Sequence, residues 1–332
     1  MLLYDDIAAE YRDFAAYAAG DSETFRDWST RVADDAEVHA WLATLPPIKR
    51  QPNLVFAAAR FHGVPAPASY DVLRAALLAD DGTIRATILA RATQTNEVGR
   101  LATLLPAFAR LVEDRPLALL EVGASAGLCL YPDRWAYEWT TDAGVVRLGE
   151  PDADPASVLA CRAKGDVPLP GALPQVAWRG GLDLNPLDVS DPDDMTWLTT
   201  LVWPEHDDRR ARLRHAIGVA AADPPEVRRG DLLTDLPALV DQATAHGDVV
   251  VFHSAVVAYL EPEDRITFDA TMRELVRAGR CHWVSNEGKN VLPSVTGTGP
   301  AIPADKQTFV LGVDGVAVAH THGHGRSMRW VG

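Results

Sequence analysis

The sequence predicts an α/β protein in which a helical amino-terminal region precedes a mostly parallel β-sheet with a carboxy-terminal antiparallel hairpin. Apolar residues recur at helical spacing up to about residue 115. Short apolar runs then alternate with helical patterns, which is typical of parallel strands joined by crossover helices. Near the end, Asp314-Gly315 separates two strand-like runs, 309–313 and 316–320. An Asp-Gly pair in that position favours a two-residue hairpin turn.

The helical region, residues 1–115, contains apolar stripes with almost no strand pattern. The stripes cover, in order, residues 7–15, 25–32, 38–45, 54–61, 72–77, 84–89 and 98–111. Pro46-Pro47 ends the third stripe, because proline cannot continue a helix interior. We expect the last helix, from about residue 93, to pack on the sheet.

Residues 116–332 are predicted to form the sheet domain. Strand-like runs lie at 117–122, 175–183, 226–228, 248–253 and 281–285. Asp191-Pro192 and Glu261-Pro262 begin helices, since a capping residue followed by proline is typical of a helix start. Residues 131 to about 174 contain short strand-like pieces and many prolines that break the alternation. We interpret them as an insertion.

Composition excludes several classes of protein. The 332 residues include 46 acidic and 31 basic side chains, a formal charge of −15, so a nucleic-acid partner is disfavoured. The three cysteines are scattered, which favours a reducing compartment and offers no zinc spacing. The start, residues 1–6, lacks the basic and apolar segments of a signal peptide, and no apolar run approaches 18 residues. We expect a cytoplasmic protein with a small-molecule substrate and no membrane partner; the sequence does not indicate its oligomeric state.

A glycine-rich segment, residues 121–127, follows the first predicted strand and is expected to lead into a helix. Small residues there let a ligand approach the backbone and the helix amino terminus. The same residues spell Gly-x-Ser-x-Gly, the nucleophile elbow of serine hydrolases, with Ser125 as nucleophile. In the hydrolase fold that elbow follows several strands, whereas helices precede it here. The nucleotide interpretation is therefore favoured over the hydrolase.

Three carboxylates end successive predicted strands, namely Glu121, Asp183 and Asp231. The carboxyl ends of parallel strands form the ligand crevice of open α/β sheets. Asp183 could accept hydrogen bonds from ribose hydroxyls, and Asp231 could reach an adenine edge or a sugar. The alternative is that these acids only cap the following helices.

This order of motifs resembles the class I S-adenosylmethionine-dependent methyltransferases, which have a Rossmann-like sheet. The resemblance implies that Glu121, Gly123, Ser125 and Gly127 line the methionine side of the cofactor. It also implies Asp183 at the ribose and Asp231 at the adenine. A narrower likeness is carried by segments 94–100, 120–130, 178–188, 201–205 and 284–288. On these segments the chain is identified as a member of the bacterial family called domain of unknown function 2332, which supplies no known reaction.

Further polar residues are candidates for catalysis and substrate binding. His253 follows the fourth predicted strand and could act as a general base, or it could bond only to backbone. Glu287, after the fifth strand, could orient His253 or bind a substrate amine; capping is the alternative. The substrate-binding candidates are Asn96, Glu97, Arg100, Tyr259 and Asn286. An ion pair between Glu97 and Arg100 is an equally good interpretation of those two residues. Tyr259 could belong either to the core or to the wall of a pocket.

His320, His322 and His324 alternate, so an extended strand would place them on one face, where imidazoles can bind zinc or nickel. Gly323 and Gly325 indicate a turn, no fourth ligand is evident, and we predict no metal site.

Three functions remain open from the sequence. The first is S-adenosylmethionine-dependent methylation of a small acceptor, with His253 or Glu287 as base. The second is an adenosyl-ligand-binding protein without catalysis, and the third is a serine hydrolase that uses Ser125. A nicotinamide or another adenosine cofactor also stays open.

Overall fold

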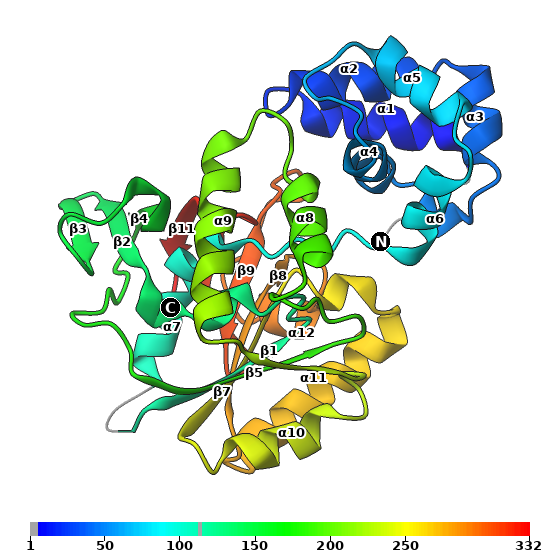
Figure 1. The fold of residues 1–332 in the computed structure, drawn as a ribbon. Helices are drawn as coiled ribbons and strands as arrows, with labels where there is room; N and C mark the ends of the chain where they lie inside the picture. Colours follow the sequence, from blue (N-terminus) through cyan, green and yellow to red (C-terminus); the bar gives the residue numbers. More distant parts are fainter. Residues whose placement is uncertain (1–5, 112–114) are drawn as a thin grey trace. The chain divides into compact units, whose positions relative to one another are not determined.

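The computed structural model of the chain describes residues 6–111 and 115–332 and divides it into two compact units (Figure 1). Unit 1 contains residues up to 95 together with 190–214, and unit 2 contains residues 96–189 and 215–332. Residues 190–214, which the sequence analysis placed with the sheet, therefore group with the helical unit. The sequence analysis expects no signal peptide from residues 1–6. Of these, residues 1–5 lie outside the described residues.

Unit 1 is helical, as the apolar stripes predict, and its helices α1–α6 are blue to cyan in Figure 1. Their N-caps include Asp6, Ser22 and Asp35, whose side chains accept backbone N–H groups of the first turn. Phe25, Trp28 and Phe56 pack edge-on and tilted in its core. The helices are α1 (Ile7–Ala18), α2 (Glu23–Val32), α3 (Ala36–Leu42), η1 (Pro47–Lys49), α4 (Pro52–Phe61), α5 (Tyr70–Leu78), α6 (Thr83–Ala90) and α8 (Pro192–Leu201). Helix α9 (Asp207–Ala222) begins in unit 1 and ends in unit 2.

Unit 2 is built on one large mixed sheet, with the strand order β3-β2-β4-β11-β10-β9-β8-β7-β1-β5-β6 over the described residues. The strands are β1 (Leu117–Val122), β2 (Ala136–Thr141), β3 (Gly144–Leu148), β4 (Val158–Lys164), β5 (Val176–Asp183), β6 (Glu226–Arg229), β7 (Asp248–Ser254), β8 (His282–Gly288), β9 (Phe309–Val313), β10 (Val316–Thr321) and β11 (Ser327–Trp330). Its helices are η2 (Val98–Arg100), α7 (Leu101–Arg110), η3 (Leu128–Leu130), η4 (Pro132–Arg134), η5 (Pro155–Ser157), α10 (Leu236–Ala243), η6 (Val257–Tyr259), α11 (Pro262–Arg277) and α12 (Pro293–Thr296).

The parallel part of the sheet runs β6-β5-β1-β7-β8, so the chain order reverses between β1 and β7. Open α/β sheets bind ligands outside the carboxyl ends of the strands at such a reversal. The predicted hairpin forms β9 and β10, and β9 pairs antiparallel with β8. The mixed α/β fold and the helical amino-terminal region are thus confirmed.

The predicted insertion, residues 131–174, contributes β2, β3 and β4, and these strands extend the main sheet. They join it through β4, which pairs in parallel with β11. The glycine-rich loop leads into the short 3₁₀ turns η3 and η4, not into the predicted α-helix. Pro132 explains this correction, because it lacks the N–H that a helix continuing from Leu128 would need.

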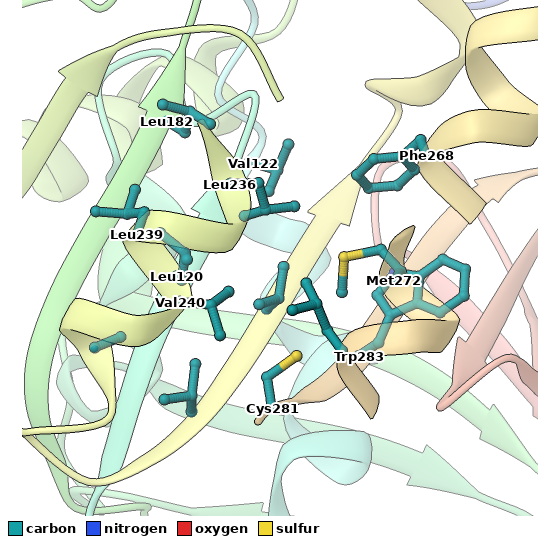
Figure 2. Close-up of a cluster of buried hydrophobic side chains, with 14 of the residues drawn as sticks. Leu120, Val122, Leu182, Leu236, Leu239, Val240, Phe268, Met272, Cys281 and Trp283 are labelled. Carbon is teal, nitrogen blue, oxygen red and sulfur yellow. The ribbon is translucent and has the colours of Figure 1, made fainter. Parts of the chain in front are cut away.

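The two faces of the sheet are covered by different helices. On one face, Leu120, Val122 and Trp283 pack under α10 and α11, which contribute Leu236 and Phe268 among other buried residues (Figure 2). On the other face lies α7, which packs against β4 and β8. We call these the α11 face and the α7 face. No helix among the described residues is long and apolar enough to cross a membrane.

Candidate functional site

The glycine-rich loop at the end of β1 has a left-handed backbone at three positions. Gly123, Ser125 and Gly127 have φ values of 67°, 53° and 69°. A serine in this region is uncommon and is found where the surroundings enforce it. Ser125 N–H donates to Asp183 Oδ2 at 2.8 Å, and Gly123 N–H donates to the Leu182 carbonyl at 2.7 Å. The end of β5 therefore fixes the loop.

Asn96 holds the same loop from the other side. Its Oδ1 accepts hydrogen bonds from the backbone N–H groups of Ala126 at 3.2 Å and Leu128 at 3.1 Å. A helix that began after the loop would also leave these N–H groups without an intrahelical partner, so they need an acceptor such as the Asn96 side chain. The side chain of Asn96 thus supports the loop by binding the loop's backbone. The sequence analysis did not consider this role for the substrate-binding candidate.

The carboxylates of Asp183 and Asp231 both lie at the carboxyl edge of the sheet and both accept backbone N–H groups. Besides Ser125, Asp183 accepts the N–H of Asn185 through Oδ1 at 2.7 Å. Asp231 is exposed, and its Oδ1 accepts the N–H of Leu233 at 2.8 Å. Each carboxylate therefore binds a backbone N–H of the loop that follows its strand, whereas the N-caps of the following helices α8 and α10 are Asp191 and Asp235.

Glu121 lies beneath the loop, on the α7 face at the end of β1. Its side chain is buried, with 6% of the residue exposed, and Oε2 has no hydrogen-bond partner among the described residues. Burial raises the pKa of Glu121 well above its ordinary value, Arg100 opposes this, and Asp183 adds to it. A buried carboxyl with an open oxygen therefore lies at the reversal point between β1 and β7.

Arg100 and Glu97 belong to the 3₁₀ turn η2 just before α7. Glu97 is buried and caps the turn by accepting the N–H of Gly99 at 3.2 Å. Arg100 donates from Nε to the Gly323 carbonyl and from Nη1 to the Ser254 carbonyl, each at 2.8 Å. It therefore ties η2 to the end of β7 and brings a positive charge near Glu121.

Asn286 belongs to a buried hydrogen-bonded network on the α7 face. Its Nδ2 donates to Ser254 Oγ at 2.9 Å, and its Oδ1 accepts from Thr321 Oγ1 at 2.6 Å. The network links β7, β8 and β10. The sequence analysis did not single out Ser254 or Thr321 as site residues, although the two-residue alternation along each strand places them on the same side as Asn286.

His253 and Glu287 lie on the opposite, α11 face of the sheet, and they contact each other. His253 Nδ1 is 2.7 Å from Glu287 Oε1, and its Nε2 is 3.0 Å from Trp283 Nε1. The indole can only donate, so Nε2 accepts and Nδ1 carries the proton. Both nitrogens of this fully buried ring are thus engaged, and neither is open to a substrate.

Glu287 Oε1 also accepts the N–H groups of Val256 and Val257, at 2.9 and 3.1 Å. Glu287 therefore contacts both the ring of His253 and the loop after β7. Its Oε2 is buried and has no partner among the described residues. Tyr259, farther along this loop, is 63% exposed and is therefore not part of the core.

The histidines near the end of the chain form no metal cluster. His320 is the last residue but one of β10, and His322 Nδ1 accepts the N–H of His324 at 3.0 Å within a turn. No group of three His, Cys, Asp or Glu side chains that could hold a metal occurs in the part of the chain that the structure describes.

Comparison with known proteins identifies the family. The family model described as an uncharacterized protein conserved in bacteria (DUF2332) matches residues 8–330, so the chain belongs to this family. No curated protein and no solved structure matches the chain.

Proposed function

We propose that unit 2 binds S-adenosylmethionine and methylates a small-molecule acceptor, with a sheet of the methyltransferase type. The observation that carries this proposal is the open, buried Oε2 of Glu121 beneath a left-handed glycine-rich loop, at the point where the strand order reverses. An oxygen of this kind fits a cationic group of a ligand, because a buried acceptor without a partner is costly.

The residues around the loop fit the parts of such a cofactor. Glu121 would accept the ammonium of the methionine part. Arg100 would attract its carboxylate, because Nε and Nη1 of Arg100 bind backbone carbonyls while its Nη2 has no partner among the residues that the structure describes. Asp183 would bind the ribose, and exposed Asp231 would bind the adenine. When bound, the cofactor would supply an electrophilic methyl group.

The positions of the candidate bases limit the chemistry. His253 has no open nitrogen, so it acts as a positioning residue that holds Glu287 and the loop after β7. The protein would then work mainly by aligning acceptor and methyl group. This favours acceptors that are nucleophilic without a general base, such as thiolates and neutral amines.

The buried Oε2 of Glu121 beneath the loop also favours a second candidate, an adenosyl-ligand-binding protein without catalysis.

The hydrolase candidate rests on the left-handed backbone of Ser125. It would need a histidine beside the serine, and His253 is bound to Glu287 and Trp283 instead. A fluorophosphonate probe that labelled wild type but not Ser125→Ala would support the hydrolase.

Calorimetric titration with S-adenosylmethionine, S-adenosylhomocysteine and NAD tests the cofactor. We expect both adenosyl ligands to bind and NAD not to bind. Glu121→Gln should weaken binding about tenfold, since it removes a charged hydrogen-bond acceptor. Glu274→Gln, an exposed acid on α11, is the matched control and should bind like wild type. Absence of binding to wild type would refute the proposal.

Production of S-adenosylhomocysteine with a panel of small thiols and amines separates the enzyme from the binding protein. Turnover with any acceptor supports methylation. Tight cofactor binding without turnover over the whole panel supports the second candidate.

A further inference from the structure

A concave surface of unit 2 lies on the α11 face of β4, β11 and β10 and is also lined by residues 306–308. Its volume is about 330 Å³, and no acidic residue lines it. The lining residues that matter here are Arg162, Lys164, Ser327, Arg329, His320 and Lys306. We call this surface the cationic groove.

The strand register places three of these basic side chains in one row. His320 on β10 pairs with Arg329 on β11, and Arg329 pairs with Lys164 on β4. Paired residues on neighbouring strands point to the same face, and the strands lie about 4.8 Å apart. Arg162, two residues before Lys164, shares this face and pairs with Ser327.

The basic side chains of the groove are not engaged in ion pairs within the described part of the chain. Arg162, Lys164, Lys306 and Arg329 form no ion pair among the described residues. Like charges directly opposite on neighbouring strands are destabilising. The pKa of His320 is lowered by partial burial and then by the positive charges of Lys306 and Arg329, which places both charges close to His320.

The groove also stands out against the rest of the sequence. The protein has a formal charge of −15, and only four of its 31 basic residues are lysines. Two of those four, Lys164 and Lys306, line this one surface. A third, Lys289, donates from Nζ to the carbonyls of Pro303, Ala304 and Lys306 at 2.7–2.9 Å, which fixes the segment that carries Lys306.

The fold leaves this part of the sheet open to a ligand. On the other side of the same strands, Arg110 of α7 stacks over Trp330 of β11 at 5.6 Å. On the α11 face, the apolar cluster under α10, α11 and α12 reaches Val310 and Ala317 of β9 and β10. The exposed positions of β4 and β11 beyond it carry the basic residues.

We propose that the cationic groove binds a small phosphorylated anion that carries a diphosphate. Two guanidinium groups can hold phosphate oxygens in bidentate fashion, and two ammonium groups supply further charge. The volume fits a small molecule, and the overall negative field disfavours a long polyanion. The groove lies on the sheet face opposite Glu121, so this proposal does not depend on the proposed function.

Titration of the full chain with inorganic pyrophosphate, and separately with inorganic phosphate, tests the groove. We expect pyrophosphate to bind at least tenfold more tightly than phosphate, with an affinity that falls as salt concentration rises. The double variant Lys164→Gln/Arg329→Gln should lose at least tenfold in pyrophosphate affinity. Lys164→Arg should retain binding. Arg277→Gln, an exposed base on α11, is the control and should bind like wild type.

Thermal unfolding guards against a variant that merely misfolds. Without ligand the double variant should melt at or above the wild-type temperature, because like-charge repulsion is relieved. Pyrophosphate should raise the melting temperature of wild type but not of the double variant. No pyrophosphate binding to wild type, equal binding by the folded double variant, or equal affinity for phosphate and pyrophosphate would each overturn the proposal.

Discussion

The backbone N–H of Ser125 donates to the carboxylate of Asp183 at 2.8 Å, so the end of β5 holds the loop that follows β1. The two residues are 58 positions apart in the chain, and residues 131–174 lie between them. Through this bond the ribose-binding candidate also shapes the glycine-rich loop. Removal of Asp183 therefore affects loop structure as well as any ligand contact.

Asp183→Ala should lower the free energy of unfolding by about 1–3 kcal/mol, because it leaves the N–H groups of Ser125 and Asn185 without their acceptor. Asp183→Asn should cost less, since the amide retains one acceptor oxygen. Urea unfolding of both variants measures the difference. Equal stability of wild type and Asp183→Ala would show that the loop does not need this bond.

His253→Phe should lower the free energy of unfolding by about 2–5 kcal/mol, because it leaves the buried Trp283 N–H and Glu287 Oε1 without the ring between them. His253→Gln should cost less, because its amide can both donate and accept. If methyl transfer is found, His253→Gln should retain it. A stable His253→Gln protein that bound cofactor but had lost transfer would instead make His253 a catalytic base.

Much of the fold follows from local sequence patterns. Helical spacing predicts α1 to α7, and apolar runs predict β1, β5, β7 and β8, because each pattern is contained in one element. Strand β11 was not predicted, because it is only four residues long and pairs with β4, more than 150 positions away. The strands that pair with β11 could not be inferred from the spacing of apolar residues in the sequence.

The candidate site was predictable in part. Glu121 and the loop were expected because a glycine-rich segment after a buried strand has a direct physical meaning. The engagement of His253 could not be predicted, because it depends on Trp283, which reaches it through the pairing of β7 with β8. Likewise the network of Asn286 with Ser254 and Thr321 depends on which strands are neighbours.

Gly123→Ala should destabilise unit 2 through two separable effects. Its φ of +67° costs about 1–2 kcal/mol for any residue with a Cβ. The new Cβ would also lie 2.5 Å from both Cγ atoms of Val256, and such overpacking costs about 1–3 kcal/mol. Val256→Ala in the same chain should remove most of the second cost, as measured by urea unfolding, because both Cγ contacts disappear and only the Cβ at position 256 remains, at 3.0 Å.

Gly279→Ala is the control for the backbone effect, because Gly279 has a φ of +66° and nothing within 4 Å of its added Cβ. Gly279→Ala should lower the free energy of unfolding by about as much as Gly123→Ala does when it is introduced into the Val256→Ala background. If Gly123→Ala cost no more than Gly279→Ala, the contact between the loop after β1 and the loop after β7 would not be tight.

Glu121 should make stability depend on pH in a way that Glu121→Gln abolishes. Burial raises the folded-state pKa of Glu121 above its ordinary value of 4.5, so the folded protein binds this proton more tightly than the unfolded chain does. The contribution of Glu121 to the free energy of unfolding is therefore largest below pH 4.5 and falls as pH rises through the folded-state pKa. Urea unfolding of both proteins from pH 4.5 to pH 8 measures this.

The variant should therefore gain stability relative to wild type steadily as pH rises, while Glu274→Gln should follow the wild-type curve, because that carboxylate is exposed. A ligand that brings a positive charge to Glu121 would reverse the slope, since it would favour the ionised carboxylate in the folded state. Parallel curves for Glu121→Gln and wild type would mean that Glu121 is solvated as an ordinary surface acid, and the open oxygen beneath the loop would lose its meaning as a ligand contact.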